Sequence, residues 1–268
     1  MKPKIIDTHS HLYSSKFDKD KEEVINRAKE VLEAVFLPNI DRSSIEGMHA
    51  LADHSPDFFY PTMGLHPSDA GEDYEEVLAD LKVWLDSGKY SYYAIGETGI
   101  DLYWKENIAR REFQEASLAV QTGWAKSYGL PIILHTREAT DVVIELMQKH
   151  NDDSLSGVFH CWDGEWEQAQ KVMELGGFKM GIGGNVTYRK SVQAVVKEIP
   201  LEYIVLETDS PYLAPEPFRK AKNRRNESSY TTYVAEKVAE VKGISYEAVA
   251  EQTNQNAKEL FQLNQKIS

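Results

Sequence analysis

Cysteine is almost absent from this sequence, since Cys161 is the single one among 268 residues. A disulfide within the chain is therefore excluded, which agrees with a reducing compartment. Long hydrophobic runs are also missing, because no stretch approaches the roughly 18 apolar residues that a membrane-spanning helix requires. The N-terminus has no apolar segment behind basic residues of the kind that signal peptides carry. These absences predict a soluble, cytoplasmic protein with no membrane partner.

Positive charge is scarce as well. The 30 Lys and Arg residues face 43 Asp and Glu residues, which leaves a formal net charge of -13 at pH 7. Such a surface repels phosphates and excludes broad electrostatic binding to nucleic acid, so any phosphate-bearing substrate must be received locally. Residues 219–225 depart from this balance with five basic residues in seven, as either a solvated loop or a phosphate-receiving one.

Apolar runs and amphipathic segments alternate along the whole chain, without a Gly/Ser-rich linker. Eight strand–helix units in a chain of this length favour an α/β fold, a single (β/α)8 TIM barrel over residues 1–268, against the alternative of a doubly wound open sheet. The short apolar runs are typical of strands buried on both faces. They are Lys4–Asp7, Ala34–Pro38, Phe58–Met63, Tyr92–Gly96, Pro131–His135, Gly157–His160, Gly177–Gly181 and Tyr203–Leu206.

Stripes of residues at helical spacing predict the helices between these runs. One stripe joins Phe113, Ala116, Val120 and Trp124. A long polar loop and two further helices follow the last strand, so we expect a barrel with extra C-terminal helices. The stripe of the final helix consists of Tyr246, Val249, Ala250, Thr253, Ala257, Leu260 and Phe261.

Two histidines follow the first apolar run directly, in Asp7-Thr8-His9-Ser10-His11. A strand sends alternate side chains to the same face, so a His-x-His pair at its end aims two imidazoles at one point. This arrangement is typical of metal ligands. Two histidines do not fill a coordination sphere, and further ligands are expected elsewhere.

Four more candidate ligands stand at or just past the ends of later strands. In a (β/α)8 barrel these ends converge on one face, where active sites are built. The spacing along the chain assigns the candidates, with the His-x-His pair, to strands 1, 4, 5, 6 and 8. We therefore expect six potential ligands in one mouth, the four later ones being Glu97, His135, His160 and Asp209.

The other histidines have plainer interpretations. His49 and His54 fall in a predicted helix or at its end, and His150 closes a helix predicted from residue 140, where an imidazolium suits the negative end of the dipole. We interpret all three as structural. His66 follows the third strand and faces the mouth, where substrate contact and loop packing are equal alternatives.

Six segments form a motif combination that spans nearly the whole chain: 7–12 (DTHSHL), 64–67 (GLHP), 94–101 (AIGETGID), 131–137 (PIILHTR), 159–164 (FHCWDG) and 207–213 (ETDSPYL). Together they resemble the TatD family of metal-dependent deoxyribonucleases, within the amidohydrolase superfamily. The chain departs from the family's usual pattern at residues 162–163 and at Ser228, away from any implied ligand. The resemblance implies a (β/α)8 fold and a binuclear divalent-metal centre.

The resemblance also implies how the ligands divide. His9, His11 and Asp209 would hold one ion, His135 and His160 a second, and Glu97 would bridge both. Mixed imidazole and carboxylate ligation favours Zn, Mn, Fe or Co, with Mg usable at a weakly occupied site. Two such ions can share a water, lower its pKa and stabilise both oxygens of an in-line displacement. Asp209 can orient the hydroxide and accept its proton, so Asp209 and Glu97 are the predicted catalytic residues.

We therefore expect a 3′–5′ exodeoxyribonuclease, an activity that the resemblance implies, acting on DNA that is single-stranded or on strand ends. The candidate phosphate and substrate contacts are His66, Arg137, Arg224 and Arg225. Aromatic residues offer a further candidate contact, since Trp104, Trp162 and Tyr212 either stack on unpaired bases or pack in the core. Two alternatives remain open: a hydrolase of a carboxylic ester or amide, such as a D-aminoacyl-tRNA deacylase, and a non-catalytic metal-binding protein.

Overall fold

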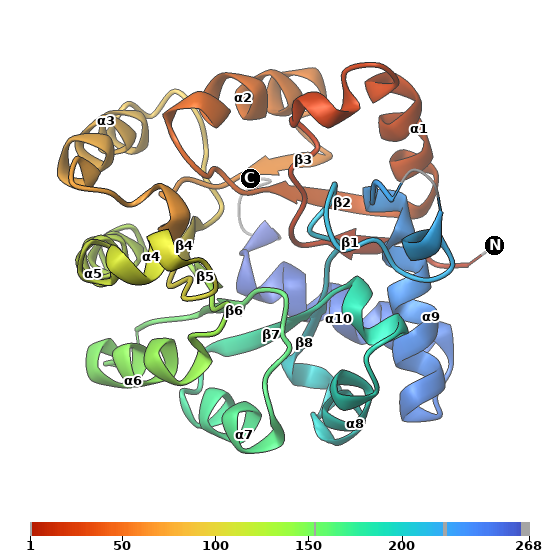
Figure 1. Cartoon of the computed structure of the whole chain (residues 1–268). Coiled ribbons are helices and arrows are strands. Elements are labelled where there is room, and N and C mark those ends of the chain that lie inside the picture. The colour runs from red at the N-terminus through yellow and green to blue at the C-terminus, as the bar shows by residue number, and fades with distance from the viewer. Residues whose placement is uncertain (1, 153, 222–223, 264–268) are drawn as a thin grey trace.

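The computed structural model describes residues 2–152, 154–221 and 224–263. Eight parallel strands form the inner wall of a barrel, and helices surround it (Figure 1). The strands are β1 (Ile5–Asp7), β2 (Leu32–Leu37), β3 (Phe59–Pro61), β4 (Ile95–Gly99), β5 (Ile132–His135), β6 (Gly157–Phe159), β7 (Phe178–Ile182) and β8 (Ile204–Leu206).

The strands pair in chain order, as β1–β2–β3 and as β4–β5–β6–β7–β8. Backbone hydrogen bonds close the two seams between these sheets. Between β3 and β4, the Gly96 N–H donates to the Met63 carbonyl at 2.8 Å, and between β8 and β1 the Thr8 N–H donates to the Leu206 carbonyl at 3.0 Å. The barrel is closed, which confirms the predicted (β/α)8 fold over the open sheet.

Ten α-helices are present in the described part of the chain. Two of them follow β8, which confirms the predicted extra C-terminal helices. None of the ten is long and apolar enough to cross a membrane. The helices are α1 (Lys21–Val31), α2 (Ile45–His54), α3 (Tyr74–Asp86), α4 (Lys105–Ala109), α5 (Arg111–Tyr128), α6 (Thr140–His150), α7 (Trp166–Glu174), α8 (Lys190–Glu198), α9 (Thr231–Lys242) and α10 (Tyr246–Leu260).

Helix α10 seals the end of the barrel at which the strands begin. Phe261, directly after this helix, packs in the barrel interior with its ring centroid 4.0 Å from that of Phe36. The side chains of Asn254 and Asn256 bind backbone groups at the starts of β1 and β8. The predicted stripe of this helix, over residues 246–261, is buried as expected.

Helix α5 buries Trp124 of the predicted stripe, but the rest of its buried face is shifted from the predicted one. Val120, a member of the predicted stripe, is 41% exposed, whereas Gln114 and Gln121 are fully buried. Gln121 accepts a hydrogen bond from the Leu65 N–H at 2.9 Å, and Gln114 accepts one from the Asp101 N–H at 2.8 Å. Buried amides are stable when their hydrogen bonds are satisfied. These two glutamines fix the loops that follow β3 and β4.

Strand β4 begins three residues later than predicted. Gly96 and Gly99 have φ angles of +136° and +140°, in a region that favours glycine. A Cβ atom on Gly99 would overlap the carbonyl oxygen of His135, so glycine lets β4 lie this close to β5. The strand therefore continues through a glycine-rich run that resembles a turn in the sequence, and Glu97 lies within the strand rather than past its end.

Candidate metal centre

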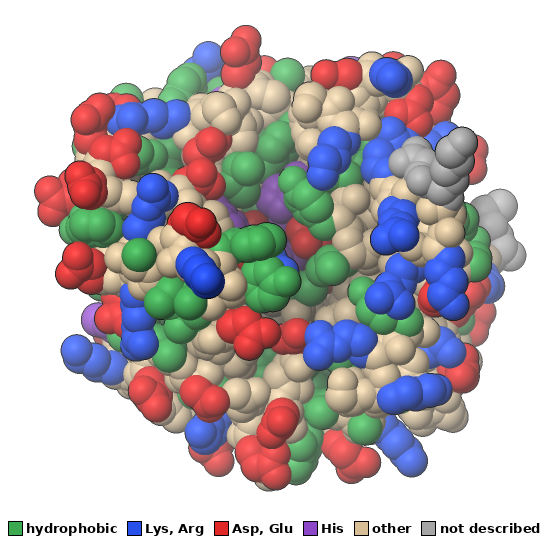
Figure 2. All heavy atoms as spheres, viewed as in Figure 1, with side chains coloured by type: hydrophobic (Ala, Val, Ile, Leu, Met, Phe, Trp, Pro, Cys, Tyr) green, Lys and Arg blue, Asp and Glu red, His purple; other side chains and the backbone are tan. Residues whose placement is uncertain are grey.

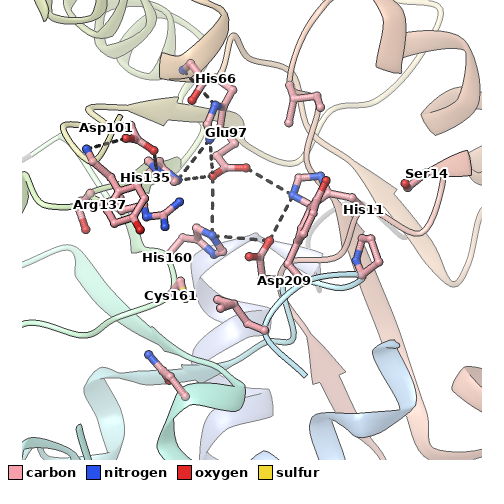
Figure 3. Close-up of a pocket in the computed structure, with 18 of the residues that line it drawn as sticks. His11, Ser14, His66, Glu97, Asp101, His135, Arg137, His160, Cys161 and Asp209 are labelled. Atoms are coloured by element: carbon pink, nitrogen blue, oxygen red, sulfur yellow. Dashed lines mark hydrogen bonds and ion pairs between the residues drawn. The ribbon is translucent and has the colours of Figure 1, made fainter. Parts of the chain in front are cut away.

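The six predicted ligands meet at the carboxyl ends of β1, β4, β5, β6 and β8, the five strands to which their spacing assigned them (Figure 3). His9, His11, Glu97 and His160 are buried, and His135 and Asp209 are partly buried. His49, His54 and His150 lie on α2 and α6, away from this group.

Glu97 lies in the middle of the group, and its two carboxylate oxygens face different histidines. Oε2 is 3.2 Å from His9 Nε2 and 3.6 Å from His11 Nε2. Oε1 is 2.9 Å from His135 Nδ1 and 3.7 Å from His160 Nε2. Burial opposes ionisation of this carboxyl, but the surrounding histidines hold its pKa well below the usual range. Glu97 is a buried carboxylate with imidazoles at both of its oxygens.

Asp209 completes the group beside the His-x-His pair. Its Oδ1 is 3.4 Å from His11 Nε2 and 3.9 Å from His9 Nε2. The residue has a φ of +57°, a left-handed conformation that Asp adopts more readily than most residues. Ligand atoms of His9, His11 and Asp209 all lie within 4.8 Å of one another, a spacing at which one ion can be held.

Contacts made outside the group decide which nitrogen of His11, His135 and His160 faces it. His11 Nδ1 is 2.8 Å from the hydroxyl of Tyr13, and this hydroxyl donates its own proton to the Pro38 carbonyl. The Tyr13 oxygen therefore accepts from His11. His11 carries its proton on Nδ1 and turns an unprotonated Nε2 towards Glu97.

His135 is held in the opposite orientation. Its Nε2 is 3.1 Å from Asp101 Oδ2, while Nδ1 faces Glu97. Burial opposes ionisation of Asp101, but hydrogen bonds, that with His135 foremost, lower its pKa and keep it an acceptor. His135 therefore donates through Nε2 and presents Nδ1 to the centre.

A buried carboxylate also holds His160. Glu207, which is completely buried, places Oε1 2.9 Å from His160 Nδ1. Burial lowers the pKa of His160, but the carboxylates of Glu207, foremost, and of Glu97 and Asp209 more than offset this effect and raise the pKa to about 10. The same Glu207 oxygen accepts the N–H of Cys161. Nε2 of His160 is thereby left to face Glu97 and Asp209.

His66 also contacts the Glu97 carboxylate, but through a protonated nitrogen. The Ser68 N–H donates to His66 Nδ1 at 3.1 Å, so a neutral ring carries its proton on Nε2. That Nε2 is 3.4 Å from Glu97 Oε1 and 3.3 Å from His135 Nδ1. A protonated nitrogen donates a hydrogen bond and does not bind a cation. Ligand atoms of His66, Glu97 and His135 nevertheless lie within 4.8 Å of one another, so His66 differs from the six predicted ligands in its protonation and not in its position.

The donor set fits a divalent cation. The Nε2 atoms of His9 and His11 face each other at 3.2 Å, and His9 Nδ1 has no hydrogen-bond partner among the described residues. Lone pairs of the His9 and His11 imidazoles and of buried carboxylate oxygens thus converge, and a bound cation would replace the proton that His160 carries at neutral pH. Mixed nitrogen and oxygen donors of this kind hold Zn, Mn, Fe or Co. The group can bind metal.

A cleft of about 1380 Å³ opens above the histidines. Figure 2 shows histidine side chains at the bottom of a hollow with hydrophobic and basic side chains around it. Arg137, Arg224 and Arg225 line this cleft. Arg225 is already paired with Asp20, through two contacts of 2.6 Å. Residues 222–223 of the basic segment lie outside the described residues.

Tyr13, Asp101 and Glu207 are side chains at this site that sequence reasoning did not single out. Glu207 stands two residues before Asp209, and period-two alternation along a strand could have placed both on one face. Tyr13 likewise stands two residues after His11, whose ring it contacts. Asp101 contacts His135 from 34 residues away, and no local spacing marks that contact.

A closed (β/α)8 barrel with histidines and carboxylates gathered at the carboxyl ends of its strands defines a metal-dependent TIM-barrel hydrolase. Comparison with known proteins narrows this class. The family model described as TatD related DNase matches residues 6–262, and the chain belongs to this family.

Individual relatives cover nearly the full chain. It is 39% identical over 264 residues to the uncharacterized metal-dependent hydrolase YabD of Bacillus subtilis (strain 168), a match that covers 97% of this chain and 100% of that protein. It is 32% identical over 259 residues to a protein of Rahnella sp. (strain Y9602) named 3′-5′ ssDNA/RNA exonuclease TatD, covering 95% and 97% of the two chains. The crystal structure of YjjV, a TatD homolog from Escherichia coli K12, superposes with a TM-score of 0.88 at 28% identity, covering 96% of this chain and 98% of that one.

Proposed function

We propose that this hydrolase is a 3′–5′ exodeoxyribonuclease that uses two divalent ions to cleave phosphodiester bonds of DNA, single-stranded or at strand ends. The observation that supports the proposal is the placement of Glu97, whose two oxygens face different imidazoles. A carboxylate that offers one oxygen to each of two ions suits this placement. The relative named as a 3′-5′ ssDNA/RNA exonuclease supports the choice of substrate.

The ligands divide as follows in this proposal. His9, His11 and Asp209 would hold one ion, His135 and His160 would hold the other, and Glu97 would contact both. Zn, Mn, Mg, Fe and Co are the candidate ions. When bound, such a pair of ions supplies the water activation and charge neutralisation that in-line attack on a phosphodiester needs.

Side chains of this protein supply the remaining steps. The Asp209 carboxylate borders the ligand group, where it orients the attacking water and accepts its proton. The Nε2–H of His66 donates to an oxygen of the phosphate. Arg137, Arg224 and Arg225 receive the flanking phosphates, Arg225 from within its ion pair with Asp20. Because the rest of the chain is acidic, DNA binding is local and sensitive to salt.

The direct test is digestion of a 5′-labelled single-stranded oligonucleotide by the metal-loaded protein. We expect a ladder of products shortened from the 3′ end, and protection of the strand by an inverted 3′-terminal nucleotide. Asp209→Asn and His135→Ala abolish turnover and keep the circular-dichroism spectrum of the wild type. His54→Ala is the matched control, because this histidine is 47% exposed and distant from the centre, so its loss leaves turnover unchanged.

Chelation gives an independent check. Dialysis against a chelator is expected to stop digestion, and returning Zn or Mn to restore it. An aminoacyl-tRNA and a panel of small esters and amides, assayed with the same preparation, separate the nuclease from other hydrolases. A metal-loaded protein that leaves the single strand uncut while it hydrolyses one of these compounds contradicts the proposal.

A further inference from the structure

Every exposed aromatic side chain in the described part of the chain lines the cleft above the metal centre. These side chains are Tyr103, Trp104 and Tyr212, which are 49%, 53% and 48% exposed. Trp162, by contrast, is buried and belongs to the core. Aromatic rings left in water lose the free energy of burial unless a ligand covers them. Their concentration at one place indicates a ligand with planar, apolar faces.

Tyr103 and Trp104 form one wall of the cleft, next to His135. The Tyr103 N–H donates to Asp101 Oδ1 at 2.9 Å, and Asp101 in turn binds His135, so this wall is tied to the centre. The two rings are perpendicular, with centroids 4.7 Å apart. The guanidinium of Arg137 lies 3.7 Å from the centroid of the Tyr103 ring and has no carboxylate partner among the described residues.

Tyr212 forms the opposite wall, next to His11. Its N–H donates to the Asp209 carbonyl at 2.8 Å, and its ring centroid is 6.2 Å from that of His11. The Nζ atom of Lys16 is 4.1 Å from the centroid of the Tyr212 ring. This wall, like the first, combines an exposed ring with a cation.

The two walls flank the carboxylate at the middle of the centre. Figure 3 shows His11 and Asp209 on one side of Glu97, and Asp101 and His135 on the other. A phosphodiester bond bound next to Glu97 would therefore have one aromatic wall on each side. Single-stranded nucleic acid presents the same alternation of flat bases and negative phosphates, and proteins bind it with aromatic rings and cations placed in this way.

We infer that these walls are stacking platforms for the two bases that flank the cleaved phosphodiester, Trp104 with Tyr103 on one side and Tyr212 on the other. The inference rests on the proposed function and names the side chains that select unpaired strands. A base inside a duplex has both faces covered by its neighbours, whereas a frayed or single-stranded end can offer a face to each platform. Every base has such a face, so the platforms do not depend on base sequence.

The test combines protein variants with altered substrates. KM and kcat are measured for the wild type, Trp104→Ala and Tyr212→Ala on an intact single strand and on strands that lack the terminal or the penultimate base. Each Ala variant is expected to raise KM on the intact strand by about 5-fold to 100-fold. Removal of the base that a platform contacts should raise the wild-type KM by a similar factor. When the Ala variant acts on the strand that lacks this base, KM should be little higher than with either change alone. Trp104→Phe and Tyr212→Phe keep a ring and most of the affinity.

Ile108→Ala is the matched control. Ile108 is 53% exposed on α4, close in sequence to Trp104, but it does not line the cleft, so KM stays at the wild-type value. Discrimination between single-stranded and blunt duplex DNA is a second readout, and it falls in both Ala variants.

Two results would count against the platforms in different ways. Ala variants with a wild-type KM, or with losses that add fully to those of the missing bases, overturn the inference and leave the proposed function in place. A wild-type protein that hydrolyses bis(p-nitrophenyl) phosphate but cuts no oligonucleotide defeats the proposed function, and the platforms with it.

Discussion

His135 donates its Nε2–H to Asp101 at 3.1 Å, and this hydrogen bond leaves Nδ1 as the nitrogen that faces Glu97 at 2.9 Å. A carboxylate behind a histidine ligand fixes the tautomer of the ring and increases its basicity. The orientation of His135 therefore depends on a side chain that does not itself belong to the predicted ligand set.

Replacement of Asp101 by Asn should weaken metal binding. An amide offers an N–H as well as an oxygen, so the ring is no longer restricted to one tautomer. We expect metal affinity to fall by about 10-fold to 100-fold, measured by competition with a chelating dye. Asp163→Asn is the control, because Asp163 lines the same cleft and pairs with Arg189 rather than with a histidine. Equal affinities in the Asp101 variant and the control would show that this hydrogen bond does not tune the centre.

Gln121 offers a test of the fold that supports the site. Its side chain binds both the N–H and the carbonyl of Leu65, at 2.9 and 3.1 Å, and the Thr98 hydroxyl at 2.7 Å. Gln121→Leu leaves these buried groups without partners, and we expect the free energy of unfolding to fall by about 2–4 kcal/mol in urea titrations. Gln170→Leu, on the exposed face of α7, should change it by less than about 0.5 kcal/mol. A Gln121 variant as stable as this control would exclude the proposed role of the amide.

Replacement of two glycines by alanine should change the free energy of unfolding in opposite directions. Gly99 has a positive φ and lies against the His135 backbone, so Gly99→Ala should lower the free energy of unfolding by about 3 kcal/mol. Gly123 lies in α5 with nothing within 4 Å of an added Cβ, so Gly123→Ala should raise it by about 0.5–1 kcal/mol. Thermal unfolding of both variants checks the prediction, which fails if Gly99→Ala is tolerated.

The buried side chain of His49 should make the stability of the fold depend on pH. Burial lowers the pKa of His49 from its usual value of 6.5 to about 4, and its ring centroid lies 3.7 Å from that of Tyr90. Between pH 6.5 and 4 the unfolded chain binds a proton that the folded chain does not, so this histidine reduces stability as the pH falls. His49→Phe removes that dependence and keeps an aromatic ring.

The measurement compares the free energies of unfolding of wild type and His49→Phe at pH 7 and pH 5. Any advantage of the wild type at pH 7 should shrink by up to about 1.4 kcal/mol per pH unit below 6.5. Contributions from other groups cancel in the difference. A difference that stays constant between the two pH values would contradict the prediction.

Strand spacing was enough to place the predicted ligands, because the period of a strand and the convergence of strand ends in a barrel both follow from the local chain. His9, Glu97 and Asp209 are far apart in sequence, yet each stands at a strand that the apolar pattern reveals. The buried face of α5 could not be predicted in this way. Gln121 is buried because it forms hydrogen bonds with the backbone of Leu65, 56 residues earlier in the chain. No sequence pattern within the helix indicates this contact.

The aromatic residues show the same limit. Trp104 and Trp162 both follow strands, and their sequence surroundings do not show that one is exposed in the cleft and the other buried. Their environments depend on how loops from different strands pack against one another. Arg225 is a similar case, since its pairing with Asp20 joins segments 205 residues apart.

In the described part of the chain, α10 and the residues packed against it close the barrel at the end opposite the histidines. Phe261 and its neighbours fill the interior, so a ligand enters and leaves at the histidine end. For the proposed nuclease this excludes a path in which the strand passes through the barrel. The released product and the remaining strand would then share one exit, so product release, as well as chemistry, would limit how many cuts follow one binding event.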